Sequence, residues 1–356
     1  MKFGKFLLFF LLWSAWSLQA QDIHFTMFNM SPLTVNPAHT GAFLGTIRIG
    51  GIYRSQWNSS LGGDGYSTPS VYADSPFLAV GKKKRDWLGI GVAIVQDNAG
   101  TNGLKTNSFL LSGAFHKTLD KKGDHVLTLG IHQGNFSRQI DGTTVLTEQG
   151  IIDGGRTGFV GGGEELGETP KTFRDFAGGL MIKSAINEKT NLTLGTSFFY
   201  ITQPDQSLVN FSQRPDTTGM GGGGGIAPEG NNQKPSLINA HGAVAFQATD
   251  KWTVEPSAIF RVTKGLTETI LQGNAGYKFN DNLTFLMGAG YRFGDAAHLI
   301  GGVDYEGWKV LLSYDFTTSP LANDGRIRNG FEIAAQYIIK VYKKPQVDPA
   351  ILCPKF

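Results

Sequence analysis

The sequence predicts an all-β protein: a transmembrane antiparallel β-barrel of about 14 strands with an irregular N-terminal periplasmic segment. Three observations predict it. Apolar and polar residues alternate with a period of two over many segments of about ten residues. Charged residues make up only 17%, below the roughly 25% of soluble domains, whereas glycine (48 residues) and aromatic residues (12%) are abundant. No later stretch approaches the ~20 apolar residues of a membrane helix, so a membrane would be crossed by strands.

The chain begins with the pattern of a secretory signal peptide, residues 1–20. Lys2 and Lys5 supply a positive start, "FLLFFLLW" supplies the apolar core, and Ala20 is the expected cleavage point. Leu18 occupies a position where a smaller residue is preferred. The alternatives are therefore cleavage after Ser17 and an uncleaved membrane anchor. The single cysteine, Cys353, excludes an internal disulfide framework and lies too far from this site to carry a lipid.

Residues 21–45 form a turn-rich segment before the first strand. In "SPLTVNPAHTG", Asn36-Pro37 marks a turn, and Pro32 and Gly41 punctuate the ends. The segment emerges on the periplasmic side. The polar groups of irregular backbone there must be hydrogen-bonded, either by burial in protein or by water. We therefore expect it to tuck its apolar side chains into the barrel mouth, with a mobile tail as the alternative. These side chains are Phe25, Met27, Phe28, Met30, Leu33 and Val35.

The alternation assigns faces to the strands. In "NLTLGTSFFY", Leu194, Phe198 and Tyr200 share an apolar face, and in "FEIAAQYII" Phe331 points opposite to Glu332. One face is apolar and rich in aromatics, while the other carries Gly, Ser, Thr and charge. This pattern favours a polar lumen over the dry core of a sandwich, although a soluble two-sheet protein remains the alternative.

The segments are even in number, which places both termini on the periplasmic side. They span 46–56, 66–80, 86–97, 104–117, 124–136, 172–186, 189–201, 236–248, 251–262, 267–279, 282–293, 296–305, 307–315 and 329–340. The short polar turns "KKKRD", "DKKGD", "NEKT", "TDK", "NDN" and "YEG" all follow even-numbered segments. The long connections 137–171, 202–235 and 316–328 follow odd-numbered ones, which is typical of periplasmic turns and surface loops.

The barrel therefore occupies residues 46–340, and residues 341–356 form a periplasmic C-terminal tail. Its prolines oppose a further strand, and we expect the residues near Phe356 to dock on protein. The alternative is that assembly machinery alone reads this aromatic residue.

No pattern supports catalysis, a metal site or a cofactor. "GMGGGGG" at 219–225 lacks the Lys-Ser/Thr ending of a phosphate loop, and "GGGEELGE" at 161–168 lacks the spaced ligands of a calcium loop. His116, His125 and His132 have no metal-ligand spacing, so polar lumen or interface positions are the simpler interpretation. The net charge of +3 does not favour nucleic acid. We predict that the protein is not an enzyme.

The stretch "QDIHFTMFNMSPLTVNPAHTG" resembles the mature start of the PorP/SprF family of type IX secretion system outer-membrane proteins. The matching residues are Gln21, Asp22, Phe25, Pro32, Leu33, Asn36, Pro37, Ala38 and Gly41. "GYRFGDA", "GVDYEGWKVLLSYDFTTSPL" and "NGFEIAAQY" agree with the family in the C-terminal half. The sequence departs from the family pattern at Ile23, Met27 and Ser31. Its glycine-rich loops also have no counterpart in that pattern.

The resemblance implies a non-enzymatic component of the cell outer membrane that binds the C-terminal domain of secreted adhesins. Its implied partners are that domain, outer-membrane lipids and periplasmic parts of the secretion machine. We expect the long loops 57–65, 137–171, 202–235 and 316–328 to form the external interface, because only they offer enough adaptable surface. Candidate anchors in these loops are Trp57, Phe159, Leu208, Phe211 and Leu321. The fold alone leaves a porin or small-solute transporter as the alternative.

Overall fold

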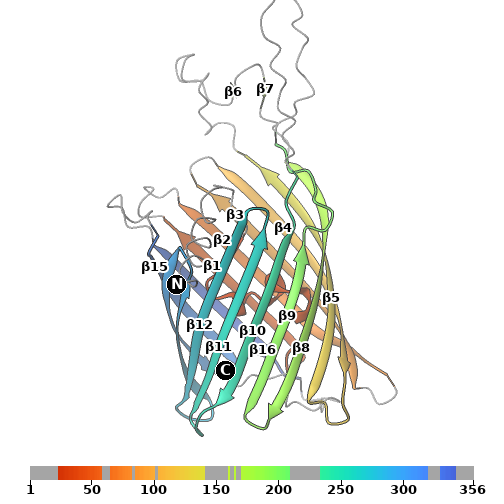
Figure 1. The fold of residues 1–356 in the computed structure, drawn as a ribbon, viewed down its shortest axis with the longest axis vertical. Coiled ribbons are helices and arrows are strands. Elements are labelled where there is room, and N and C mark those ends of the chain that lie inside the picture. Colours follow the sequence, from red (N-terminus) through yellow and green to blue (C-terminus); the bar gives the residue numbers. More distant parts are fainter. Residues whose placement is uncertain are drawn as a thin grey trace, which may run out of the picture.

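The computed structural model is a closed antiparallel β-barrel of fourteen strands (Figure 1). It describes residues 23–57, 65–81, 85–100, 103–140, 159–160, 164–165, 170–208, 233–319 and 329–341. Within these residues, no helix has the length and apolar character needed to cross a membrane.

Three short helical turns precede the barrel. They are η1 (Phe28–Met30), α2 (Pro32–Val35) and η2 (Pro37–His39). The barrel strands are β1 (Ile47–Gln56), β2 (Tyr66–Val80), β3 (Asp86–Ala99), β4 (Leu104–Thr118), β5 (His125–Gln139), β8 (Lys171–Asn187), β9 (Thr190–Phe199), β10 (Leu237–Gln247), β11 (Trp252–Thr263), β12 (Leu266–Lys278), β13 (Leu283–Arg292), β14 (Ala296–Tyr305), β15 (Trp308–Thr317) and β16 (Gly330–Ile339). Two further strands, β6 (Phe159–Val160) and β7 (Glu164–Glu165), pair only with each other.

Each barrel strand pairs with its neighbour in the chain, and β1 pairs with β16 to close the ring. The closing register runs from Ile47 opposite Ile339 to Gln56 opposite Gly330. Closure leaves no strand edge with unpaired backbone groups, which is what a strand-built protein needs inside a lipid bilayer.

The predicted strands are confirmed, with bounds that differ by a few residues. The segment predicted at 172–186 is Lys171–Asn187, and the one predicted at 307–315 is Trp308–Thr317. The predicted parity also holds. Connections at one end of the barrel are short, and the two longest ones, 140–170 and 200–236, lie at the other. We call these the short-turn end and the long-loop end.

The two faces of the wall are also as predicted. Phe331 and Ile333 are exposed on the outer surface, whereas Glu332 is 1% exposed and faces the lumen. The assignment of Tyr200 was wrong, because its side chain is buried inside. β9 ends at Phe199, and the positive φ of 57° at Tyr200 breaks the strand's alternation and turns the ring inward.

Candidate functional site

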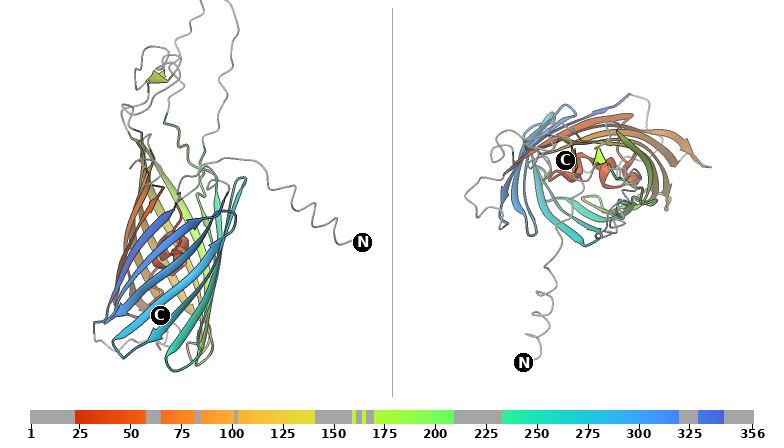
Figure 2. Two further views of the ribbon diagram at one scale, coloured as in Figure 1. Left: turned by 90° about the vertical axis from the view of Figure 1, so that its left-hand side faces the viewer. Right: turned by 90° about the horizontal axis from the view of Figure 1, so that it is seen from above.

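The first described residues of the chain, drawn in red, lie inside the ring of strands (Figure 2). We call residues 23–46 the lumen segment. Near one end of this segment, Thr26 hydrogen-bonds to Glu332, close to the long-loop end of β16. At the other, the backbone N–H of Thr46 donates to the carbonyl of Ile339, at the short-turn end. The sequence predicted insertion at the barrel mouth, and the structure places the segment deeper, along the length of the lumen.

The Glu332 carboxylate holds the segment at the long-loop end. Its two oxygens accept the backbone N–H groups of Thr26 and Met27 at 2.7 and 2.8 Å. The Thr26 hydroxyl donates to Asp315 at 2.7 Å. Two consecutive N–H groups aimed at one carboxylate fix the direction of the backbone as well as its position.

Two arginines neutralise these carboxylates. Arg54 pairs with Glu332 at 2.8 Å and with Asp315 at 3.4 Å, and Arg292 pairs with Asp315 at 3.0 Å. All four charged side chains are at most 3% exposed. We call this cluster, with Thr26, the outer anchor. Removing one member of such a buried network leaves an uncompensated charge and is strongly destabilising.

Apolar contacts continue the attachment along the segment. Phe25, Met27 and Met30 are at most 2% exposed. They pack against inward-facing wall residues, which are Ile52, Leu286, Ile300, Leu311 and Ala334. Phe28 and Val35 pack against Ile259 and Ile270, and Leu33 joins a separate aromatic cluster. Burial of these large side chains makes the segment part of the barrel core.

Asn36 fixes the segment in mid-lumen. Its Oδ1 accepts the N–H of Ala38 at 2.9 Å and caps η2, and Pro37 begins that turn with the fixed φ of proline. Its Nδ2 lies 3.2 Å from the carbonyl oxygen of Leu180 and 3.1 Å from that of Thr196. One side chain therefore ties the segment to β8 and β9.

Glycines in the wall make room for this crossing. A Cβ on Gly130 would overlap the backbone of Ala38, and a Cβ on Gly179 would overlap the Asn36 side chain. The two glycines lie directly opposite each other on β5 and β8. We call this pair the glycine notch. Part of the high glycine content thus has a steric cause.

At the short-turn end the segment lies against β2, β3, β4 and β8. The N–H of Gly41 donates to Asp74 at 2.7 Å, and Asp74 also accepts two bonds from Arg48 at 2.8 Å. Lys183 donates to the carbonyl of Ala42 at 2.8 Å. His116, one of the three clustered histidines, hydrogen-bonds to the carbonyl of Thr40 at 2.8 Å. This end is held by many bonds from different strands.

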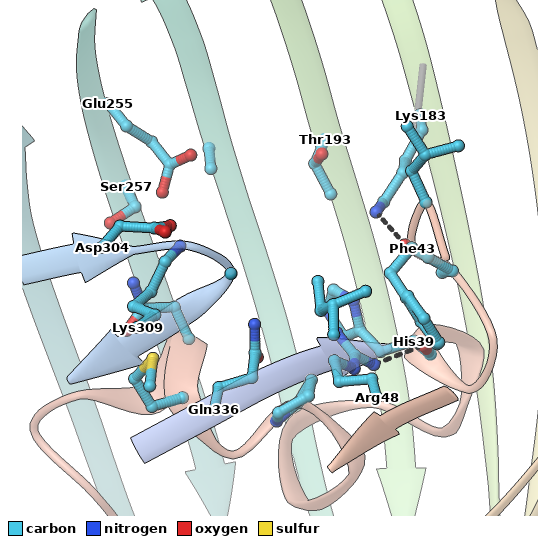
Figure 3. A pocket seen from close by; sticks show the side chains of 18 of the residues that line it. His39, Phe43, Arg48, Lys183, Thr193, Glu255, Ser257, Asp304, Lys309 and Gln336 are labelled. Carbon is cyan, nitrogen blue, oxygen red and sulfur yellow. Dashed lines mark hydrogen bonds between the residues drawn. The ribbon is translucent and has the colours of Figure 1, made fainter. Parts of the chain in front are cut away.

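The opposite wall at the short-turn end borders a cavity of about 670 Å³ (Figure 3). Glu255, Asp304 and Lys309 lie together on one side of it, and Lys183 and His39 lie on the other. Its volume is within the range of small-molecule sites. Burial, and then the neighbouring charges of His241 and Lys183, hold the pKa of His39 well below its usual 6.5.

The predicted site residues fall into two groups. Every described member of the N-terminal motif, from Phe25 to Gly41, lies in the lumen segment and contacts the wall or shapes a turn. Gln21 and Asp22 lie outside the described residues. The motif is therefore a structural unit inside the barrel.

The predicted loop anchors stay largely untested. The ring of Trp57 packs edge-on against Tyr66, with centroids 5.3 Å apart, and Leu208 is partly exposed. Phe159 is described only as backbone of β6, and Phe211 and Leu321 lie outside the described residues.

Sequence reasoning missed the outer anchor as a site, although a signal was present. Arg292 and Glu332 stand at polar positions of otherwise apolar alternating strands. A charge on the lumen face is hydrated in an open barrel and needs a partner only where the lumen is occupied, so each one was a candidate contact for a segment inside the lumen. The partner itself, Thr26, is about 300 residues from Glu332 in the sequence and shows no pattern of its own.

A closed barrel with an apolar outer surface and a filled, charged lumen defines an outer-membrane β-barrel protein. The family model of the type IX secretion system membrane protein PorP/SprF matches residues 17–337. The chain therefore belongs to the PorP/SprF family and is a protein of the outer membrane. No curated protein matches the chain.

Solved structures of outer-membrane barrels are similar at low identity. The toluene transporter TbuX of Ralstonia pickettii has a TM-score of 0.47 at 12% identity, covering 87% of this chain and 93% of its own. A FadL homologue of Pseudomonas aeruginosa has a TM-score of 0.46 at 12% identity, covering 85% and 92%. At these values nothing about function carries over to this chain.

Proposed function

We propose that this protein is a non-enzymatic component of the type IX secretion system that binds the C-terminal domain of secreted surface proteins for export or anchoring. The long-loop end faces the outside of the cell in this proposal, and the short-turn end faces the periplasm. Family membership supports the secretion role. In this proposal the interface, of roughly 1,200–2,000 Å², would be formed by the two longest connections, 140–170 and 200–236.

The observation that carries the proposal against the porin alternative is the occupied lumen. A porin needs a continuous water-filled passage. Here residues 23–46 run along the lumen, bury Phe25, Met27 and Leu33 almost completely, and bond to the wall at both ends. A barrel filled in this way is suited to presenting a surface, with solute passage blocked.

The interface in this proposal combines the long loops with the residues at their bases. Among the described residues, two are candidates for apolar contacts. Trp57 directly follows β1, and Leu208 lies beyond the end of β9. Aromatic and large apolar side chains at the centre of a patch usually carry most of the binding free energy. Contacts with periplasmic components would use the short-turn end, where the cavity of about 670 Å³ opens.

The test is deletion of the gene, followed by a surface proteome and a solute-uptake assay. We expect the loss of surface display of one or a few proteins that share a C-terminal domain, with unchanged uptake of small nutrients. Re-expression of the wild-type chain should restore display. An unchanged surface proteome together with reduced uptake would favour the transporter alternative and contradict the proposal.

A further inference from the structure

A small pocket lies toward the long-loop end of the lumen. It has a volume of about 50 Å³ and lies between the lumen segment and the wall strands β3, β4, β5, β9, β10 and β11. Ile23 and Thr34 border it from the lumen segment. A space of this size accepts a few water molecules or one small aliphatic group.

Four buried polar side chains line this pocket, and each has an atom without a hydrogen-bond partner among the described residues. The side chains are Ser108, His132, Asn239 and Arg261, and they are between 1% and 8% exposed. The unpartnered atoms are Ser108 Oγ, His132 Nδ1, Asn239 Oδ1 and Arg261 Nε. An unsatisfied buried polar atom costs roughly 1–3 kcal/mol, so four around one pocket indicate an occupant with donors and acceptors.

The rest of the wall is apolar. Leu110, Phe136 and Leu237 are at most 8% exposed and belong to one hydrophobic cluster with Phe199 and Tyr200. The Phe199 ring also lies against His132, with centroids 5.2 Å apart. An occupant must therefore combine an apolar part with a hydrogen-bonding part.

The pocket lies at the base of the two longest connections. β5 ends at Gln139 and β9 ends at Phe199, where connections 140–170 and 200–236 begin, and β10 starts at Leu237, where the second one returns. A segment of a partner held by these loops would reach the pocket before any other part of the lumen.

We propose that this pocket binds one aliphatic residue of a peptide segment from the exported partner. The side chain would pack against Leu110 and Phe136, while its flanking amides meet the unpartnered atoms. Asn239 Oδ1 accepts a backbone N–H, and Arg261 Nε donates to a carbonyl. A carboxylate is less suitable because Arg261 already faces Glu268 at 3.5 Å, and the volume excludes a large aromatic ring. The inference rests on the proposed function.

The direct test uses the purified full chain in detergent and two probes. N-acetyl-valinamide carries an aliphatic side chain between two amides, and N-acetyl-glycinamide lacks the side chain. We expect saturable binding of the valine probe by ligand-observed NMR, and at least tenfold weaker binding of the glycine probe. Ser108→Leu, which fills the pocket, should weaken valine-probe binding at least tenfold, and Ser108→Ala about fivefold through loss of one hydrogen bond.

Ser112→Ala is the matched control. Ser112 lies on the same strand, is 2% exposed and has an equally unpartnered hydroxyl, but does not line the pocket. We expect it to bind the valine probe as the wild type does. No saturable binding to the wild type, or equal binding by Ser108→Ala and wild type, would overturn the proposal and leave water as the occupant.

Surface display separates this inference from the proposed function. If gene deletion abolishes display but a folded Ser108→Leu variant restores it fully, the pocket proposal is wrong and the proposed function stands. If deletion leaves display unchanged, the proposed function fails whatever the probes show. Loss of display with Ser108→Leu and normal display with Ser112→Ala would support the pocket.

Discussion

The two ends of the lumen segment are held in different ways. At the long-loop end, Thr26 depends on a compact cluster of buried charges whose members pair with one another. At the short-turn end, residues 40–42 make separate hydrogen bonds to four strands. One attachment is concentrated and the other is distributed. A single substitution should therefore release the long-loop end more readily than the short-turn end.

The space left beside each end also differs. The segment starts against β1, β13, β15 and β16 and finishes against β2, β3, β4 and β8, so it crosses the lumen diagonally. The small pocket at Ser108 lies beside its start, and the charged cavity lies beside its end. In that cavity, Glu255 and Lys309 make no ion pair with any described residue.

The largest effect is expected at the outer anchor. Glu332→Ala removes the nearer carboxylate partner of the buried Arg54, which keeps Asp315 at 3.4 Å, and leaves two backbone N–H groups without their acceptor, so we expect a loss of about 3–5 kcal/mol in the free energy of unfolding. Thermal unfolding in detergent measures it. Glu188→Ala, in an exposed turn, is the control and should change stability by less than about 0.5 kcal/mol. Equal effects of the two substitutions would contradict the concentrated attachment.

A smaller effect is expected at the glycine notch. Gly179→Ala places a Cβ against Asn36 and should destabilise the protein by about 1–3 kcal/mol through overpacking. Gly178→Ala is the matched control, because a Cβ there meets nothing within 4 Å. The comparison needs only melting temperatures. Equal melting temperatures of the Gly179→Ala and Gly178→Ala variants would contradict close packing of the lumen segment against Gly179.

The distributed end should respond weakly. Lys183→Met keeps the apolar stem but removes the hydrogen bond to the Ala42 carbonyl, so we expect a loss of about 1 kcal/mol. Limited proteolysis of the purified protein should show residues 40–46 still protected. Cleavage within residues 40–46 after this one substitution would show that the attachment at the short-turn end depends on a single contact, as it does at the long-loop end.

The smallest effect is expected from pH. His39 has a lowered pKa in the folded state, so its neutral form stabilises the closed lumen fully above about pH 6.5, and this contribution is lost as the pH falls below that value. Melting temperatures between pH 7.5 and 5 should fall more for the wild type than for His39→Gln, which cannot titrate. Parallel pH profiles would exclude His39 as the cause.

Much of the barrel was predictable because strand alternation is a local property. Three successive residues, Phe331, Glu332 and Ile333, are enough to indicate which side chains face the lumen and which face outward. Polar turns such as "NEKT" indicate where the strands end. Tyr200 was misassigned because one residue with positive φ after a strand reverses the expected face, and no sequence rule marks a tyrosine for that conformation.

The candidate site was predictable only in part. The motif from Phe25 to Gly41 was recognised as one unit, and its apolar side chains indicated insertion into the barrel. Its depth could not be predicted, because depth depends on contacts such as that between Thr26 and Glu332, which join residues at opposite ends of the chain. Neither the glycine notch nor the pocket at Ser108 has a signature in one strand alone, since each forms only after the barrel closes.

The most direct test of the closed lumen is ion conductance of the purified wild-type chain in planar lipid bilayers. Because residues 23–46 fill the lumen and are bonded at both ends, we predict no steady conductance from the wild type, and channel openings from Glu332→Ala as the outer anchor fails. A steady, ohmic, porin-sized conductance of the wild type would contradict the account.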